Sequence, residues 1–592
     1  MQTLTPSVTE PQAKEAIFSP GDPTPSPGLS SFEARISPPT VSLDNPALRD
    51  YVARQRKRVK EYVHPSQNPR ALMELGDIHA IRGEIPAAIN CYKNAIALDS
   101  SLILGYKKII PLLLNLRRVD EADRFFSRLV GATNQHVDYV QDYSLFQMSQ
   151  FPTDLERIKR VRHHLQALVE HNPKHAALLN TYGIVLLMWF DDIDQARDQF
   201  LRVLKFDDHN IHANNNFGLC CLYRGNNDEA KSYFEKAISI DPNYVPGYEN
   251  LAANELSLGH NDEALTILTK ALANGIHLTV PWQHNLGWLL ILRGDYQKAK
   301  PIYVELSRAE PSNNLVLNNL GYCEERTGDQ DAAKKVYSAA VMAFREHQKS
   351  GVDEAYRKAS LNAYYNLGRV LNGERDNNLT DQIGKEIIHL DGPNARGYYF
   401  RGAAAIREKK FVFAKAELEK AFDLKPDFVD PYIDLGFYYE SIEHNYDKAV
   451  YVLQTADEKG LQHPLVANNL AYAYIKQGSL DKAQRILQTK LEHPALLATR
   501  GLFQMHKGNV KEGNDLYKKA IDTLKSERAK DEAKQAWHYE LADYYRNQGM
   551  VQQAEDELRV AMGVNVQTYI EQDIKVLMAE LKELSRDQPK LN

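Results

Sequence analysis

The chain has 592 residues with 72 Lys and Arg against 78 Asp and Glu, which gives a formal net charge of −6. This near balance argues against a strongly basic nucleic-acid-binding protein and against an acidic tail protein, so no nucleic acid partner is expected. The longest apolar stretch runs from Ile184 to Phe190 and is too short to cross a bilayer, which needs about 20 residues. The four cysteines suit a reducing compartment. No opening segment has the pattern of a secretory signal peptide, so the sequence favours a cytoplasmic location without a membrane span.

Residues 1–50 differ in composition from the rest of the chain. They contain 9 of the 26 prolines and 12 Ser or Thr, and such a segment cannot bury enough apolar surface to offset its ordering entropy. We therefore expect a disordered leader over 1–50. A basic leading helix is expected over 51–67, with Arg54, Arg56, Lys57, Arg58 and Lys60. This basic cluster fits either a solvated turn ahead of the first repeat or an electrostatic contact with an acidic partner or a phosphate surface.

From about residue 68 the chain repeats itself with a period near 34 residues. The clearest copy begins at Ile211, and others begin at Val280 and Ala395. Each predicted first helix contains a small residue at the same position: Gly76, Gly183, Gly218, Ala252, Gly287, Gly321, Gly368, Gly402, Gly436, Ala471, Gly501 and Ala542. Each predicted second helix contains another: Ala88, Ala122, Ala196, Ala230, Ala264, Ala299, Ala333, Ala414, Ala449, Ala483, Gly513 and Ala554.

Each recurring position has a physical reason. Two antiparallel helices pack closely only where neither carries a bulky side chain, which predicts that the two small positions face each other. Large residues such as Tyr223, Phe234, Tyr303 and Tyr337 are expected to fill the space between adjacent hairpins. Glycine between the two helices suits a left-handed helix cap, and proline after the second helix ends its hydrogen-bond ladder. Since each hairpin alone leaves one apolar face uncovered, neighbouring hairpins must stack.

This pattern resembles the tetratricopeptide repeat (TPR) family, whose 34-residue helix-turn-helix units carry small and large residues at these positions. The resemblance covers residues 68–565. It implies an all-α fold, an α-solenoid of about fourteen units wound as a right-handed superhelix. The units near 103–173 and 361–394 match the pattern less well.

Two longer spacings and the end of the chain complete the predicted architecture. The distances from Gly321 to Gly368 and from Gly501 to Ala542 exceed one period, and both predict longer helices rather than added domains. A capping helix is expected over 566–585, ahead of a tail over 586–592. Its apolar residues recur at helical spacing and would cover the last exposed apolar face: Tyr569, Ile570, Ile574, Leu577, Leu581 and Leu584.

A row of asparagines marks the predicted first helices, which line the concave side of a TPR solenoid. Asn lies two residues before the small position in several units, with further Asn and aromatic residues beside it. The candidate peptide-binding residues are Asn216, Asn250, Asn285, Asn319, Asn366, Asn469, Asn215, Asn318, Trp288 and Tyr322. An amide side chain pairs with a peptide group in both directions, so the row could hold an extended polypeptide, with aromatic residues adding contact area.

The asparagine row also resembles the ladder in the TPR superhelix of O-linked N-acetylglucosamine transferases, although nothing in this chain resembles their catalytic domain. The alternative is that each Asn bonds to the next repeat and sets the superhelical pitch. Phe400, Asp434, Thr181 and Thr499 interrupt the row, so a continuous groove is best supported between Asn216 and Asn366.

The sequence contains no recognisable catalytic, metal-binding or cofactor-binding motif. Phosphate-loop, dinucleotide-binding, His-Glu-x-x-His and Gly-x-Ser-x-Gly patterns are all absent from it. The clamp by which some TPR proteins hold the carboxylate of heat-shock chaperones is not found in register. We therefore predict a non-enzymatic scaffold or adaptor that binds extended segments of other proteins. Two alternatives stay open: a stable subunit or assembly factor of a larger complex, for example pilus, secretion or envelope-export machinery, and a substrate-recruiting partner of a separate enzyme.

Overall fold

The computed structural model describes residues 46–587 except 63, 350, 352, 353, 565, 567 and 569. Every described helix is α-helical apart from the short 3₁₀ helix η1, and no strand occurs among the described residues. The chain divides into two compact units, which meet in sequence between Ile302 and Tyr303. Most of the predicted leader, 1–45, lies outside the described residues, and the helix α3 already begins at Pro46.

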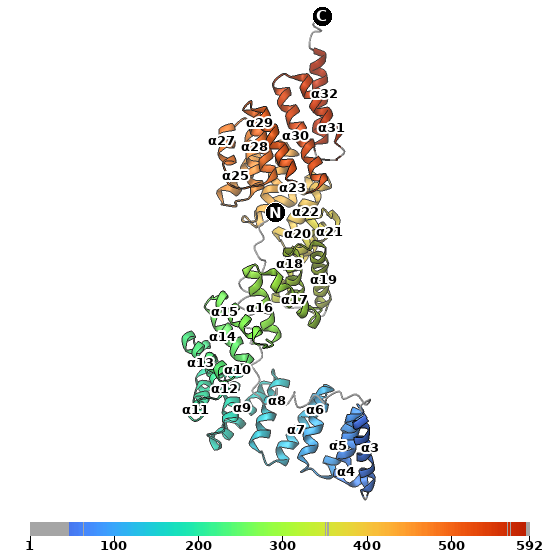
Figure 1. The fold of residues 1–592 in the computed structure, drawn as a ribbon, viewed down its shortest axis with the longest axis vertical. Coiled ribbons are helices and arrows are strands. Elements are labelled where there is room, and N and C mark those ends of the chain that lie inside the picture. The colour runs from blue at the N-terminus through green and yellow to red at the C-terminus, as the bar shows by residue number, and fades with distance from the viewer. Residues whose placement is uncertain are drawn as a thin grey trace. The chain divides into compact units, whose positions relative to one another are not determined.

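The N-terminal unit consists of a leading helix followed by stacked helix pairs (Figure 1). The leading helix α3 (Pro46–Glu61) and η1 (Pro65–Gln67) occupy the segment for which a basic helix is predicted. The pairs are α4 (Pro69–Ile81) and α5 (Ile85–Leu98), α6 (Ile103–Asn115) and α7 (Val119–Ala132), α8 (Val137–Gln150) and α9 (Leu155–His171), α10 (Ala176–Phe190) and α11 (Ile193–Leu204), α12 (Ile211–Tyr223) and α13 (Asn227–Ile240), and α14 (Val245–Ser257) and α15 (Asn261–Ala273). Then come α16 (Val280–Arg293) and α17 (Tyr296–Ala309), within which the boundary falls.

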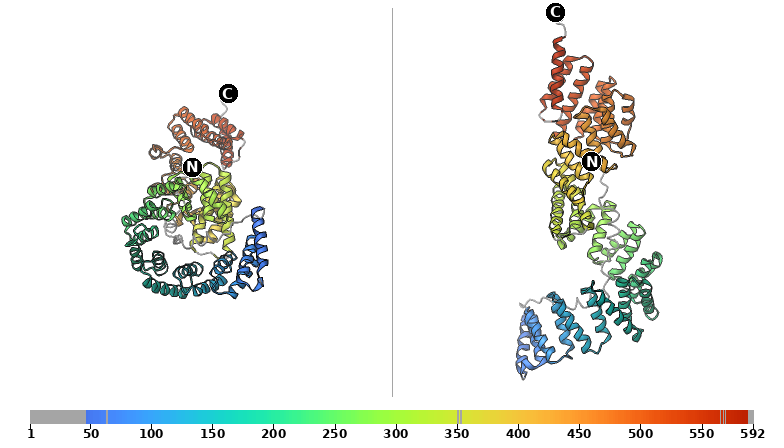
Figure 2. Two further views of the ribbon diagram at one scale, coloured as in Figure 1. Left: turned by 60° about the horizontal axis from the view of Figure 1, so that its bottom comes forward. Right: turned by 180° about the vertical axis from the view of Figure 1, so that it is seen from behind.

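The C-terminal unit repeats the same arrangement, and Figure 2 shows its stacking from two further directions. Its pairs are α18 (Asn314–Arg326) and α19 (Gln330–Gln348), α20 (Glu354–Gly373) and α21 (Asn377–Asp391), α22 (Ala395–Arg407) and α23 (Phe411–Leu424), α24 (Val429–Ser441) and α25 (Tyr446–Glu458), α26 (Pro464–Lys476) and α27 (Leu480–Leu487), α28 (Pro494–His506) and α29 (Val510–Asp522), and α30 (Glu527–Asn547) and α31 (Val551–Gly563). The last helix is α32 (Glu571–Asp587).

The described helices from α4 to α31 alternate as first and second members of fourteen helix-turn-helix units, which confirms the predicted all-α repeat solenoid. The two long spacings correspond to long helices, as predicted: α19 and α20 have 19 and 20 residues, and α30 has 21. Each long helix adjoins the connection between units where the period lengthens, and the described residues there form no further domain.

At most of its glycine positions the first helix lies under a large side chain from the same hairpin, but Gly368 of α20 lies under Phe400 of α22 in the next hairpin. A Cβ atom on Gly218 would lie 2.7 Å from the ring of Phe234, and one on Gly321 would lie 2.7 Å from the ring of Tyr337. Phe234 and Tyr337 therefore close their own hairpins, a contact that the predicted place between adjacent hairpins did not include. Tyr223, expected to be buried with them, is 44% exposed, because it is the last residue of α12 and lies beyond the packed face.

In every unit except α8–α9, the turn between the paired helices contains a residue with a left-handed backbone. Gly225 and Gly294 have φ of 76° and 83°, as predicted for glycine at these positions. Where a unit lacks this glycine, another residue takes the same conformation, as Arg117 and Arg375 do with φ of 55° and 61°. These two turns belong to α6–α7 and α20–α21, and Lys409 makes the same turn in α22–α23 with φ of 59°, each at a cost of about 1 kcal/mol relative to glycine.

The C-terminal helix α32 covers the last hairpin. Ile570, Ile574, Leu577 and Leu581 are buried in one apolar cluster with Leu558 and neighbouring residues of α30 and α31. Leu584, predicted to belong to the same apolar face, is 47% exposed, because it lies beyond the last turn that contacts the hairpin. Tyr569 and the end of the predicted tail lie outside the described residues.

Candidate functional site

The asparagine row of the N-terminal unit bonds largely to itself. Asn250 donates from Nδ2 to Oδ1 of Asn215, at 2.8 Å, and thereby joins α14 to α12 of the preceding hairpin. Asn215 in turn donates to Oδ1 of Asn216 at 3.3 Å. Asn215, Asn216 and Asn285 are each at most 5% exposed, and Asn250 is partly buried. This chain of amides therefore links neighbouring first helices.

The C-terminal unit repeats the link. Asn366 donates to Asn318 at 2.9 Å across the α18–α20 contact, and Asn318 donates to Asn319 at 3.3 Å. Asn319 donates to the hydroxyl of Tyr303 at 3.1 Å. In this unit Asn318, Asn319 and Asn366 are at most 7% exposed, so their amides are committed to the fold.

Near the C-terminus the row continues through a threonine. Thr499 of α28 donates to Asn468 at 2.7 Å, Asn468 donates to Asn469 at 2.8 Å, and Asn469 donates to the carbonyl oxygen of Ile433 at 3.3 Å. Thr499 therefore interrupts the row of asparagines but not the row of hydrogen bonds, because its hydroxyl makes the same inter-repeat bond.

Asn250, Asn366 and Asn469 each donate a hydrogen bond to the preceding repeat, as the pitch-setting alternative expects. The two aromatic candidates differ in their exposure. Tyr322 is 8% exposed, whereas Trp288 is partly buried and its Nε1 has no hydrogen-bond partner. Among the candidates, Asn469 also lines a groove in the C-terminal unit.

This groove, called here the C-terminal groove, has a volume of about 400 Å³ and is formed mainly by the first helices α24, α26, α28 and α30. Small and apolar residues occupy much of its wall, including Ala495, Ala498 and Ala533. Its aromatic residues are Phe437, Tyr446, Tyr472, Tyr517 and Tyr539. The groove therefore combines alanines, which permit close approach of a ligand backbone, with rings that offer contact area.

Lys476 is the basic centre of the C-terminal groove. Its side chain is only 10% exposed, and its Nζ lies 2.7 Å from Oε2 of Glu540 and 2.9 Å from Oδ2 of Asp543. Burial opposes the charge, but the two carboxylates outweigh burial and raise the pKa of Lys476. Tyr472 donates to the other oxygen of Glu540 at 2.7 Å. This network fixes α26 against α30.

Two further carboxylates of the C-terminal groove have raised pKa values. Glu440 is 4% exposed, its Oε1 has no hydrogen-bond partner, and burial raises its pKa well above the usual value. Burial also raises the pKa of Asp573, whose Oδ1 lies 3.4 Å from Nε2 of His444. Outside the groove lining, Asp434 takes the asparagine position of α24, and burial followed by the charge of Asp430 raises its pKa to about 7.

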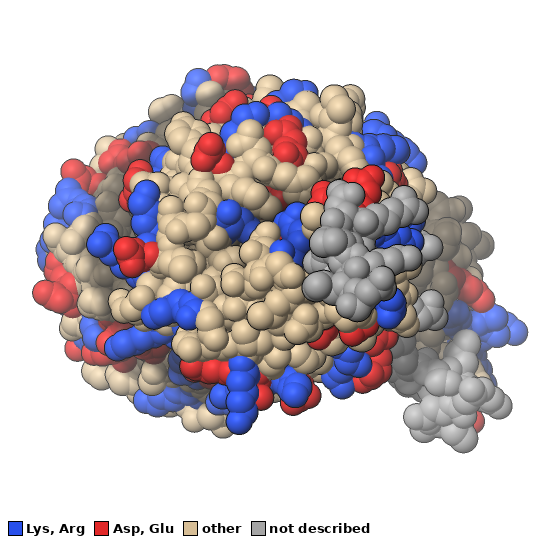
Figure 3. Space-filling model, turned by 90° about the horizontal axis from the view of Figure 1, so that it is seen from above, with Lys and Arg blue, Asp and Glu red and all other residues tan. Residues whose placement is uncertain are grey.

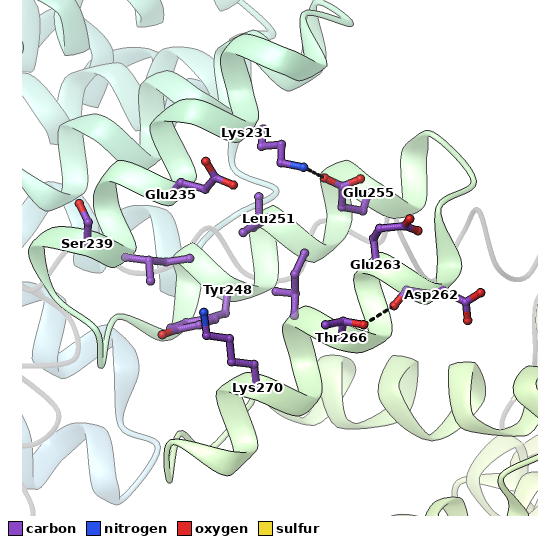
Figure 4. Close-up of a pocket in the computed structure, with 12 residues that line it drawn as sticks. Lys231, Glu235, Ser239, Tyr248, Leu251, Glu255, Asp262, Glu263, Thr266 and Lys270 are labelled. Carbon is purple, nitrogen blue, oxygen red and sulfur yellow. Dashed lines mark hydrogen bonds and ion pairs between the residues drawn. The ribbon is translucent and has the colours of Figure 1, made fainter.

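The N-terminal unit has a hollow of about 620 Å³ among α13, α14 and α15, shown in Figure 4. Lys231 crosses one side of it to Glu255, with Nζ and Oε1 2.9 Å apart. Glu255 also accepts from His260 at 3.0 Å. Two of its three helices, α13 and α15, are second helices, so this hollow lies away from the asparagine row. The most buried carboxylate that lines it, Glu255, is already paired with Lys231.

The face drawn in Figure 3 carries no patch of one charge sign, because Lys and Arg alternate there with Asp and Glu among uncharged residues.

Within the described residues no group of three or more His, Cys, Asp or Glu could hold a metal ion. Burial raises the pKa of both Cys220 and Cys221 to about 12, which keeps them protonated and unreactive. No helix in the described part of the chain is both long and apolar enough to span a membrane.

Comparison with known proteins gives matches to repeat proteins. Family models described as tetratricopeptide repeat match residues 211–244 and 284–350. A curated relative, tetratricopeptide repeat-containing protein trd-1 of Caenorhabditis elegans, is 26% identical over 145 residues, which make up 24% of this chain and 19% of the relative. The match thus spans about a fifth of that relative's length.

Solved structures of similar proteins include a tetratricopeptide repeat protein from Parabacteroides merdae, 16% identical, with a TM-score of 0.35 over 43% of this chain and 98% of that one. The APC/C hetero-tetramer Cut9–Hcn1 is 14% identical, with a TM-score of 0.35 over 84% of this chain and 92% of that one. YrrB, described as a TPR protein with an unusual peptide-binding site, is 22% identical, with a TM-score of 0.26 over 33% of this chain and 95% of that one.

Proposed function

Because this chain is built from tetratricopeptide repeats, we propose that it is a non-enzymatic scaffold or adaptor that binds extended segments of other proteins. The observation that supports this proposal is the C-terminal groove, in which four successive first helices and parts of the second helices α25 and α29 present alanines and aromatic rings around a volume of about 400 Å³. A peptide backbone fits beside alanine, and its side chains gain contact area from the tyrosine rings.

The proposal moves the binding site relative to the sequence prediction. Most of the asparagine row is occupied by hydrogen bonds between repeats, so ligand contact at the Asn216–Asn366 part of the row would require these bonds to be exchanged. Asn469 and its neighbour Asn468 line the C-terminal groove, and here the row and a ligand surface coincide. We therefore propose the C-terminal groove as the principal peptide site.

A blocking substitution tests this function. Ala498→Trp places an indole in the groove from a partly buried position on α28, and we expect it to abolish capture of peptides selected from a random display library. Ala273→Trp is the matched control, because Ala273 is exposed at the end of α15. Equal peptide binding by the two variants, with unchanged circular dichroism, would refute the groove as the binding site.

The alternative of a stable subunit in a larger complex draws on a different surface. Val412 of α23 and Tyr451 of α25 are 86% and 71% exposed, and both belong to second helices rather than to the groove. Under this alternative, complex formation in cell extract would be insensitive to Ala498→Trp and would respond to Val412→Asp with Tyr451→Asp. The role of a substrate-recruiting partner of a separate enzyme is a variant of the groove function and predicts loss with Ala498→Trp.

A further inference from the structure

One carboxylate of the C-terminal groove has no partner. Glu440, at the end of α24, is 4% exposed and lines the groove, and its Oε1 makes no hydrogen bond. Among the described residues no basic side chain lies within ion-pair distance of it. An unpartnered buried carboxyl group costs free energy whether it is neutral or charged, so its presence in a groove wall needs a reason.

The other carboxylates of the C-terminal groove are each matched by a basic side chain. Glu540 lies 2.7 Å from Lys476, Glu532 lies 3.1 Å from Arg375, and Asp573 lies 3.4 Å from His444. Of the basic groups that line the groove, Lys476 and His444 are paired with acidic ones, and Nδ1 of His493 accepts from the backbone N–H of Ala495. Glu440 is left as the one lining carboxylate that could receive a further positive charge.

The walls around this carboxylate suit the stem of a long basic side chain. Phe437 lies on the same helix as Glu440, and Tyr446, Tyr472 and Tyr539 also line the groove. Rings of this kind pack against the methylene groups of lysine or arginine and attract the charged end. An aliphatic side chain would use the rings and leave Glu440 unpartnered, whereas a basic one would pair with the carboxylate and favour its charged form.

We propose that the C-terminal groove binds an extended peptide through a lysine or arginine side chain of the partner, whose cation bonds to Glu440. This inference rests on the proposed peptide-binding function and specifies its partner class. The bound cation supplies the hydrogen bond that Oε1 lacks, and the adjacent rings hold the stem of the side chain. The rest of the peptide lies along the alanines of α28 and α30.

The test begins with a 12-residue random peptide library displayed against the full-length chain, with counter-selection on Ala498→Trp to retain only groove-dependent peptides. We expect these peptides to carry Lys or Arg at a recurrent position. Lysine is replaced by norleucine, which lacks only the ammonium group, and arginine by citrulline, which keeps the length and removes the charge. Either change should weaken binding to the unmodified protein by about tenfold to a hundredfold. This comparison needs no variant of the protein.

The second arm is Glu440→Gln, which keeps the shape of the side chain and removes its charge. Charged and uncharged peptides should bind Glu440→Gln with nearly equal affinity. A double-mutant cycle that combines this substitution with the change in the peptide then assigns the preference for the charged peptide to Glu440. Glu235→Gln is the matched control, because Glu235 is an exposed carboxylate lining the N-terminal hollow of Figure 4. It should leave the discrimination unchanged.

The outcomes separate the inference from the function on which it rests. If selection yields no peptide that depends on the groove, both the groove function and the cation site are refuted. If groove-dependent peptides appear without a basic residue, or if Glu440→Gln still discriminates against the uncharged peptides as the unmodified protein does, the cation site is refuted and the groove function stands.

Discussion

Replacement of Lys476 by methionine tests the electrostatic account of the C-terminal unit. The substitution keeps the volume of the side chain and removes a cation that lies 2.7 Å from Glu540 and 2.9 Å from Asp543. Removing one member of a buried ion pair typically costs about 3–5 kcal/mol, because the remaining charge is left uncompensated. Here both carboxylates keep a second partner, since Tyr472 donates to Glu540 and Arg546 pairs with Asp543. We therefore expect a loss near the lower limit, about 3 kcal/mol.

The measurement is urea unfolding of the full-length chain followed by circular dichroism, combined with hydrogen exchange of the peptides that cover α26 and α30. The stability deficit should be largest at neutral pH and shrink as pH falls. In the unmodified protein burial raises the pKa of Asp543, but Lys476 outweighs burial and the pKa is lowered. Asp543 therefore adds to the free energy of unfolding at pH values above its unfolded-state pKa, and this contribution is lost as pH falls through its folded-state pKa. Lys476→Met lacks the contribution.

A matched control and a refuting result complete this experiment. Lys511→Met removes an exposed lysine of α29 and should change the free energy of unfolding by less than about 0.5 kcal/mol. If Lys476→Met loses no more stability than this control, or if its deficit is independent of pH, the network does not stabilise the packing of α26 against α30 and the reasoning is wrong.

Three further predictions concern the repeat framework. Gly218→Ala should destabilise the protein by about 1–2 kcal/mol despite the helix propensity of alanine, because the new Cβ would lie 2.7 Å from an aromatic ring. Gly131 is an exposed helical residue with open space around it, so Gly131→Ala should be neutral or stabilising in the same urea titration. Asn250→Ala should cost about 1–3 kcal/mol by leaving the buried oxygen of Asn215 without its donor, and a melt indistinguishable from that of the unmodified chain would contradict the inter-repeat bond. Asp434→Asn should stabilise the protein by more than about 1 kcal/mol at pH 8 and hardly at all at pH 4. The reason is that the folded-state pKa of Asp434, about 7, lies above the unfolded-state value, so the free energy of unfolding falls as pH rises from 4 to 7. Equal effects at both pH values would exclude this titration.

The fold could be predicted from the sequence because its signal is repeated. The small residue at Gly218 and its equivalents recurs many times in register, so local errors in single units do not change the architecture. The partner of that residue could not be predicted in the same way. Spacing places Phe234 on the second helix but leaves open whether its ring covers the same hairpin or the next, and only the packing shows that it covers Gly218.

The candidate site was less accessible to sequence reasoning. The asparagine row identifies residues that carry amides on the first helices, but an amide that bonds a ligand and one that bonds Asn215 to Asn250 have the same sequence pattern. Glu440 and Lys476 were not predicted as site residues. Both lie at the ends of first helices and neither repeats with the 34-residue period, so the periodicity that revealed the fold gave no signal for them. Their significance follows from burial and from contacts between helices far apart in sequence.

The division of tasks among positions of one repeat has a consequence for how this protein can change over time. In several hairpins a large side chain over a glycine closes the helix pair, and in several an amide joins the hairpin to its neighbour, whereas alanines of the C-terminal groove such as Ala498 belong to neither set of contacts. Substitutions at these alanines can therefore accumulate without breaking either contact, whereas changes at Lys476, Asn469 or Thr499 would also loosen the scaffold. A new binding preference can then arise from a handful of changes on an architecture that stays the same.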